Sequence, residues 1–302
     1  MHVVKIAHNT PVHEVSKMLR EAPAGKDFKN YEHGKARATG FVSAGANFMK
    51  PEDLEAAKSH IERFTDLMHD FNKGEKSASA IIHGGTDAGL MKVVADAASG
   101  KNVPVIGISP HQATTSDFEG HGDTPMAKNT IHILTDSAET HPFVKGGKPL
   151  DVKDKYGHWG TERQVMMNVV KSSAVEGAPI FSVVGNGGGG ALKEVVSLLE
   201  MSRDGKNEHH IVLLKGSGRV ADALAEYYEK GASLKDIKVQ VKDLAKVSKP
   251  EDAFKTLGDI LKQEGVTEDD LRNHKASIHV HDIRQENAVN TFSALFHKAV
   301  RK

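Results

Sequence analysis

The chain has 302 residues, a length that accommodates one large α/β domain or two small ones. Its 40 Lys and Arg residues balance its 40 Asp and Glu residues, which argues against a protein that binds nucleic acids through a surplus of positive charge. The absence of cysteine excludes disulfides, thiolate metal sites and a cysteine nucleophile. No apolar run approaches about 18 residues and no signal-like amino terminus is present, so we expect a cytoplasmic protein without a membrane partner.

Predicted strands and helices alternate along most of the chain. Buried apolar runs predict strands at residues 36–43, 78–83, 103–109, 130–135, 178–185 and 210–214. Helical spacing of apolar residues predicts helices at 11–22, 51–73, 90–99, 161–173, 192–203, 220–230 and 285–302. Strand–helix alternation implies right-handed crossovers between parallel strands. The sequence therefore predicts an α/β fold, a Rossmann-like three-layer sandwich with a mostly parallel sheet.

The two ends of the chain differ from the alternating middle. We assign residues 1–35 to an N-terminal arm, residues 36–232 to the Rossmann-like core, and residues 233–302 to a C-terminal helical extension packed on that core. The arm contains a short edge strand near residues 1–8, and the extension contains a late strand at residues 276–280.

Three glycine-rich turns each follow a predicted strand and precede a predicted helix, at residues 84–89, 187–190 and 216–218, and Gly45 lies in a fourth candidate turn. Glycine lets the backbone approach a ligand, and the start of the following helix attracts anions. Because the carboxyl ends of parallel strands lie on one edge of the sheet, we expect these turns to line one cleft that binds a nucleotide or another phosphate-bearing ligand. The alternative is that glycine serves only close packing of helix on strand.

Two of these turns resemble the signatures of a known enzyme family. The segment Gly84-Gly85-Thr86-Asp87-Ala88-Gly89-Leu90-Met91 resembles the Gly-Gly-Gly-x-x-Gly-Leu-Met signature of the Lonely Guy phosphoribohydrolases and their lysine decarboxylase-like relatives. The segment Asn186-Gly187-Gly188-Gly189-Gly190-Ala191-Leu192-Lys193-Glu194 is similar to their second signature, Pro-Gly-Gly-x-Gly-Thr-x-x-Glu. Asn186 replaces the proline and Ala191 replaces the threonine, while Glu162-Arg163 resembles the element that carries the family's helix arginine.

The wider pattern resembles the amino-terminal cytosolic region of melastatin-type TRP channels, which belongs to the SLOG superfamily. Residues 83–91, 105–110 and 215–222 carry this resemblance, which spans roughly residues 36–230. It implies a stand-alone SLOG protein whose core binds a nucleotide derived from NAD, such as ADP-ribose or a cyclic form. The Lonely Guy relatives assemble as dimers, which implies a homo-oligomer here.

The motifs give a set of candidate site residues. The ligand-binding set comprises Gly45, Asn47, Gly84, Gly85, Thr86, Gly89, Asn186, Gly187, Gly188, Gly189, Gly190, Gly216, Ser217, Gly218 and Arg219. We expect a diphosphate to lie on the turns at residues 84–89 and 216–219. His141, Tyr156, His158 and Trp159 are candidates for stacking on a base, or for loop residues that cover the core.

Glu194 and Arg163 are the candidate catalytic pair. Glu194 would act as a carboxylate at an N-glycosidic bond, and Arg163 would clamp a phosphate with its planar fork. The alternatives are a glutamate that only complements a helix dipole and a solvated helix arginine. His279 and His281 have the spacing of two ligands on one strand face, but no third ligand is evident, and we predict no metal site.

These observations leave functions of different classes open. The first is a sensor or receptor for a small-molecule, ADP-ribose-like nucleotide, with no required cofactor. The second is a nucleotide phosphoribohydrolase that uses Glu194 and Arg163. The third is a scavenger of a nucleotide signal or a subunit of an assembly.

Overall fold

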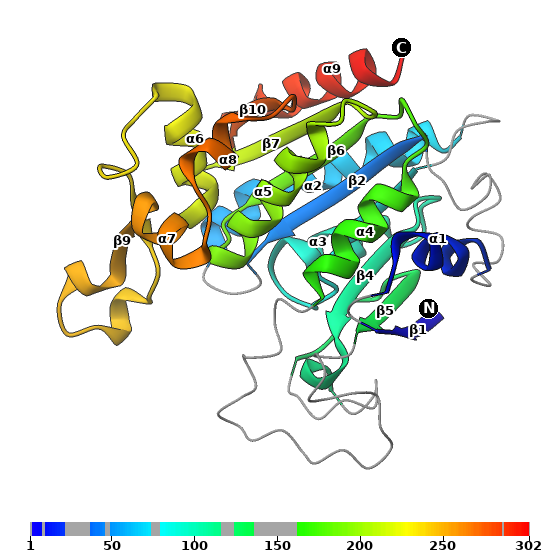
Figure 1. Ribbon diagram of the computed structural model, residues 1–302, viewed down its shortest axis with the longest axis horizontal. Helices are drawn as coiled ribbons and strands as arrows, with labels where there is room; N and C mark the ends of the chain where they lie inside the picture. Colours follow the sequence, from blue (N-terminus) through cyan, green and yellow to red (C-terminus); the bar gives the residue numbers. More distant parts are fainter. Residues whose placement is uncertain are drawn as a thin grey trace.

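The computed structural model describes residues 2–7, 10–21, 37–45, 49–73, 79–115, 124–135, 162–285 and 287–301. Its centre is an eight-stranded sheet of order β1-β5-β4-β3-β2-β6-β7-β10 in which every neighbouring pair is parallel (Figure 1). The strands are β1 (His2–Ile6), β2 (Ala38–Ala44), β3 (Ser79–His83), β4 (Val105–Pro110), β5 (Ile131–Thr135), β6 (Ile180–Gly185), β7 (His209–Lys215) and β10 (Ser277–Asp282).

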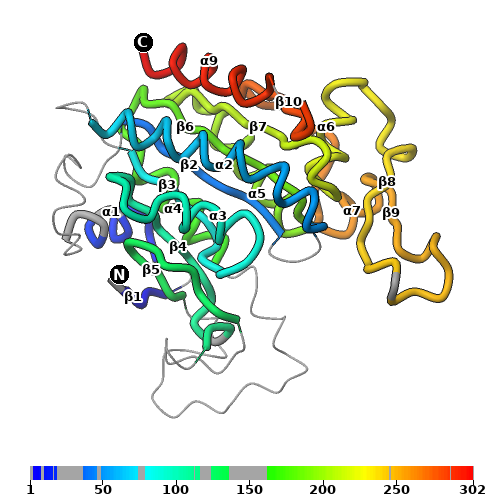
Figure 2. Tube along the Cα trace, turned by 180° about the vertical axis from the view of Figure 1, so that it is seen from behind, coloured from blue at the N-terminus to red at the C-terminus, as the bar shows by residue number. Residues whose placement is uncertain are grey.

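Helices cover both faces of the sheet, which gives three layers (Figures 1 and 2). One face carries α1 (Val12–Glu21), α4 (Arg163–Ser173), α5 (Gly189–Ser202) and α6 (Arg219–Lys230). The other face carries α2 (Pro51–Phe71), α3 (Gly89–Ala98) and α9 (Ala288–Val300). Across the described segments, no helix is both long and apolar enough to cross a membrane.

A smaller group of elements follows α6. The strands β8 (Lys238–Gln240) and β9 (Phe254–Thr256) form a separate antiparallel pair, which Figure 2 shows beside the layered body. They are followed by α7 (Leu257–Glu264) and α8 (Glu268–Arg272). Short 3-10 helices cover His111–Ala113, Leu244–Lys246 and Pro250–Ala253.

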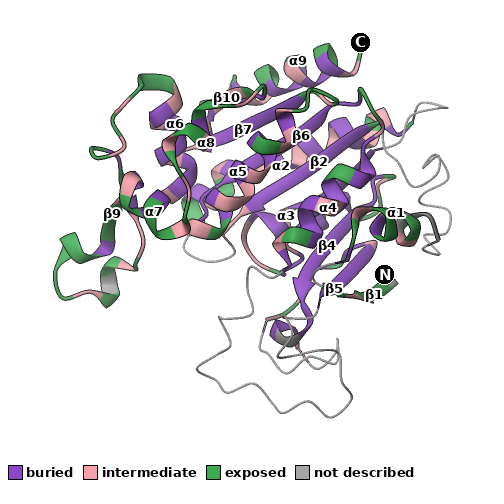
Figure 3. Ribbon diagram, viewed as in Figure 1, coloured by how far each residue is buried: buried purple, intermediate pink, exposed green. Residues whose placement is uncertain are grey.

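The core consists of two apolar clusters, one on each side of the sheet. Successive residues of a strand point to opposite faces, so in β6 the side chains of Phe181 and Val183 join the cluster under α2, α3 and α9, whereas Ile180 and Val184 join the other. Figure 3 shows the central strands buried along their length. Burial on both faces requires strands that are almost continuously apolar, which is why they can be recognised in the sequence.

The order of the strands reverses beside β2. The chain passes from β2 outward through β3, β4 and β5, and then returns to β6, which pairs with the other side of β2. In an open parallel sheet, the crevice outside the carboxyl ends of the strands at such a reversal is the usual ligand site. The fold therefore places the most favourable position for a ligand above the ends of β2 and β6.

The predicted α/β three-layer fold with its parallel sheet is confirmed. Strands from both ends of the chain, β1 and β10, pair with the outer strands of the sheet. The start of α5 was predicted at residue 192, whereas the helix begins at Gly189. Glycine is unfavourable in a helix but is tolerated in a first turn whose N–H groups have no intrahelical partner. The strands β8 and β9 were not predicted, because three residues are too few to show a period.

The packing of α9 gives a test of the fold. Phe296 is buried, and its ring stacks on that of Phe181 with centroids 4.8 Å apart. We expect Phe296→Ala to lower the free energy of unfolding by about 3–5 kcal/mol, measured by chemical denaturation. Lys298→Ala, at an exposed position of the same helix, should change it by less than about 0.5 kcal/mol. Equal effects of the two variants would contradict the placement of α9 on the core.

Candidate functional site

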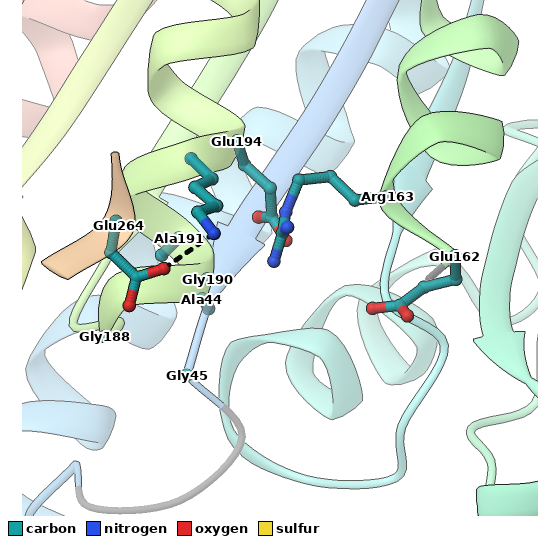
Figure 4. A pocket seen from close by; sticks show the side chains of 10 residues that line it. Ala44, Gly45, Glu162, Arg163, Gly188, Gly190, Ala191, Glu194 and Glu264 are labelled. Carbon is teal, nitrogen blue, oxygen red and sulfur yellow. Dashed lines mark ion pairs between the residues drawn. The ribbon is translucent and has the colours of Figure 1, made fainter. Parts of the chain in front are cut away.

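A cavity of about 600 Å³ lies at the carboxyl edge of the sheet, beside the ends of β2 and β6 (Figure 4). Its walls come from the end of β2, the start of α4, the first turns of α5 and the last residue of α7. The lining residues are Ala44, Gly45, Glu162, Arg163, Gly188, Gly190, Ala191, Lys193, Glu194 and Glu264. We call this cavity the switch-point pocket, because it lies where the strand order reverses.

The glycines between β6 and α5 allow charged side chains to approach the start of the helix. A methyl group at Gly190 would lie 3.4 Å from a terminal nitrogen of Arg163, and one at Gly188 would lie 2.9 Å from a terminal nitrogen of Arg219. A methyl group at Gly189 would collide with the carboxyl of Glu264. Missing side chains at Gly188 and Gly189 therefore leave room for the Arg219 guanidinium and the Glu264 carboxylate, whereas a methyl group at Gly190 would make only an ordinary contact with Arg163.

The turns after β2, β6 and β7 lie side by side. The backbone N–H of Asn186 donates to Ser217 Oγ at 2.8 Å, and the N–H of Val220 donates to the Gly187 carbonyl at 3.3 Å. A methyl group at Gly187 would lie 3.9 Å from the backbone nitrogen of Gly45. Asn186 has a φ of 55°, which is rare outside glycine. These hydrogen bonds hold the turn after β6 beside the turn after β7. The Ser217 hydroxyl takes part by accepting from the backbone of Asn186.

Arg219 lies outside the lining of the switch-point pocket. Its guanidinium approaches Gly188, and its Nε donates to the Gln240 carbonyl at 2.9 Å. Its φ of 52° follows two glycines with positive φ, Gly216 and Gly218. The turn after β7 therefore places this arginine beside the turn after β6.

The second glycine turn, which follows β3, packs against neighbouring strands and contributes no lining residue to the switch-point pocket. A methyl group at Gly85 would lie 2.6 Å from Ser109 Oγ, and that hydroxyl donates to the Gly84 carbonyl at 3.0 Å. Thr86 is buried, and Gly89 begins α3. Close packing explains the glycine at position 85, and a diphosphate on this turn stays a prediction.

Glu194 lies on α5 and is only partly exposed. Ser43 Oγ, at the end of β2, donates a hydrogen bond to its Oε2 at 2.5 Å. Burial raises the pKa of the Glu194 carboxyl to about 7, although the Ser43 hydrogen bond and the positive charge of Arg163 lower it; the negative charge of Glu162 adds to the rise. At neutral pH both protonation states are populated, as a proton-transferring carboxyl group requires.

Arg163 is the first residue of α4 and points across the pocket toward Glu194 (Figure 4). Its Nε is buried and has no hydrogen-bond partner among the described residues. A guanidinium presents several N–H donors in one plane, a geometry that suits a phosphate or carboxylate. Arg163 and Glu194 therefore give the pocket a fixed cation beside a carboxyl group that can gain or lose a proton.

Lys193 and Glu264 form an ion pair in the wall of the pocket, with 2.9 Å between Nζ and Oε2 (Figure 4). Neither residue was predicted from the sequence as part of the site. No motif singles out Glu264, because its approach to α5 depends on how α7 packs. Glu162, at the start of α4, is buried and adds a third carboxylate.

Several predicted residues cannot be placed. Asn47, His141, Tyr156, His158 and Trp159 lie outside the described residues.

His279 Nε2 lies 3.4 Å from His210 Nδ1, and His281 packs edge-on against Phe292. The described part of the chain contains no group of three or more His, Asp or Glu residues that could hold a metal ion.

Comparison with known proteins gives a family. The family model described as "SLOG in TRPM, prokaryote" matches residues 72–255, which is more than half of the chain, and the chain belongs to this family. A search of curated proteins finds no match. Among solved structures, the chain is similar to the molybdenum cofactor binding protein from the phototrophic bacterium Rippkaea orientalis, with 15% sequence identity, a TM-score of 0.32, and coverage of 59% of this chain and 76% of that one.

The SLOG resemblance seen in the sequence is thereby confirmed. The matched segment contains Arg163, Glu194 and the glycine turn between β6 and α5, and it ends before Glu264.

The raised pKa of Glu194 predicts how stability depends on pH. The folded protein binds this proton more tightly than the unfolded chain, so ionisation of Glu194 destabilises the fold as pH rises from about 4.5 through about 7. We expect Glu194→Gln to stabilise the protein against denaturant at about pH 8, with a gain that shrinks toward about pH 5. Glu200→Gln, at an exposed position of the same helix, should show no such trend. A pH-independent effect of Glu194→Gln would contradict the burial of this carboxyl.

Proposed function

We propose that this SLOG-family protein is a sensor or receptor that binds an ADP-ribose-like nucleotide, derived from NAD or cyclic, in the switch-point pocket. The observation that carries this proposal is the meeting of Arg163, the half-buried carboxyl of Glu194 and the start of α5 around one cavity. The cavity of about 600 Å³ is of the size that small-molecule sites have.

A phosphate of the ligand would lie between Arg163 and the first turn of α5. The guanidinium would donate two parallel hydrogen bonds to the phosphate oxygens. The N–H groups at the start of α5 point out of the helix, and the missing side chain at Gly190 leaves them accessible to an anion. The carboxyl of Glu194, fixed by Ser43, would accept hydrogen bonds from the ribose hydroxyls.

The test of binding removes the cation. We expect Arg163→Ala to weaken the affinity for ADP-ribose by one to two decades, which corresponds to about 1.5–3 kcal/mol for a hydrogen bond to a charged group. Arg163→Lys keeps the positive charge but loses the planar guanidinium. Its affinity for ADP-ribose should lie between those of the wild type and Arg163→Ala. Isothermal titration calorimetry measures both, with Lys171→Ala on the exposed side of α4 as the control. Loss of affinity in Arg219→Ala but not in Arg163→Ala would show that the phosphate binds at the turn after β7 and not beside Arg163.

Hydrolysis of an N-glycosidic bond is the second candidate function, and the pKa of Glu194 near 7 favours it. With a nucleoside 5′-monophosphate, protonated Glu194 would donate its proton to the departing base while a water molecule attacks C1′ of the ribose; the proton that this water loses passes to solvent, from which Glu194 is protonated again. The bond between C1′ and the base nitrogen breaks, and the products are the free base and ribose 5-phosphate. Arg163 would hold the 5′-phosphate in this reaction.

Base release separates the two functions. If the protein is a hydrolase, incubation with nucleoside 5′-monophosphates or NAD yields free base, which chromatography detects. Glu194→Gln should then abolish turnover while binding persists, and the rate should fall above about pH 7 because the acid must be protonated. Tight binding without base release would support the sensor. Turnover that survives Glu194→Gln would contradict the role given to this carboxyl.

A further inference from the structure

The carboxylate of Glu264 lies beside the first residue of α5, in the space that a side chain at Gly189 would fill. Glu264 is the last residue of α7, and it lies against Gly189, the first residue of α5. Its Oε2 pairs with Lys193 Nζ at 2.9 Å, on the second turn of the same helix. The side chain of Glu264 is 19% exposed and that of Lys193 is 37% exposed, so the pair borders the pocket without being buried.

Two features of the pocket suit an anion. The first turn of α5 has free N–H groups and a positive helix end, and Lys193 adds a full charge. In the opposite wall of the same pocket, Arg163 Nε is buried without a hydrogen-bond partner among the described residues. A ligand carrying two phosphate groups would meet Arg163 with one and the Lys193 side with the other, where Glu264 already lies.

We propose that Glu264 is a built-in competitor for a phosphate of the ligand. This inference rests on the nucleotide site proposed above and names the residue that sets its affinity for anions. A phosphate carries more charge and more acceptor oxygens than a carboxylate, and an ion pair that borders solvent is weak. A phosphate-bearing ligand therefore displaces Glu264 from Lys193, whereas a ligand without a group at this position leaves the pair closed.

The test is Glu264→Gln, which removes the charge and keeps the shape of the side chain. We expect it to bind both inorganic pyrophosphate and ADP-ribose about tenfold more tightly than the wild type, as measured by calorimetry. Lys193→Met should weaken the binding of both ligands, because the Glu264 carboxylate remains while the ammonium group that pairs with it is lost. Glu226→Gln removes a carboxylate from an exposed ion pair on α6 and should change neither affinity. Because Lys193→Met shifts affinity in the opposite direction, the two variants test the inference even if one folds poorly.

The outcomes separate this inference from the proposed function. If Glu264→Gln binds pyrophosphate more tightly but neither protein binds a nucleotide, Glu264 is the competitor and the nucleotide proposal fails. If ADP-ribose binds the wild type and Glu264→Gln with the same affinity, or binds the variant more weakly, the competitor role is overturned and the nucleotide site stands. If no anion binds Glu264→Gln better than the wild type, the inference is wrong.

Discussion

The site depends on the absence of side chains in the turn between β6 and α5. Arg219 and Glu264 come from separate helices, and each reaches this turn through a space that a side chain at Gly188 or Gly189 would fill. The cluster of charges therefore follows from a backbone property. The strand reversal at β2 and β6 decides where this turn lies, and the glycines decide what can approach it.

The charges of the pocket are arranged in opposed pairs. Arg163 faces Glu194, whose pKa burial raises to about 7, and Lys193 faces Glu264. A charge that is partly removed from water is stabilised by an opposite charge beside it. Internal pairing supplies this opposite charge, and a phosphate then has to replace a partner that is already present. If a phosphate binds as proposed, its affinity would therefore depend on exchange between two anions.

The sequence predicted the sheet because a parallel sheet buries both faces of its strands, and apolar runs such as residues 178–185 are easily recognised. Arg163 and Glu194 were predicted as a pair from motif resemblance, and the structure brings them into one pocket. Glu264 could not be predicted, since its position depends on the packing of α7. Glycine itself was ambiguous: Gly189 leaves room for the pocket residue Glu264, whereas Gly85 leaves room for the packing residue Ser109, and the two roles cannot be told apart from residue type.

The central claim is that a phosphate-bearing ligand binds at the start of α5. Hydrogen–deuterium exchange with and without saturating ADP-ribose tests it most directly, because the first N–H groups of a helix lack intrahelical partners and exchange readily until an anion accepts from them. We expect slower exchange in a peptide that covers residues 186–194 when ADP-ribose is bound. Protection confined to residues 84–89 or 216–219, with unchanged exchange at the start of α5, would contradict it.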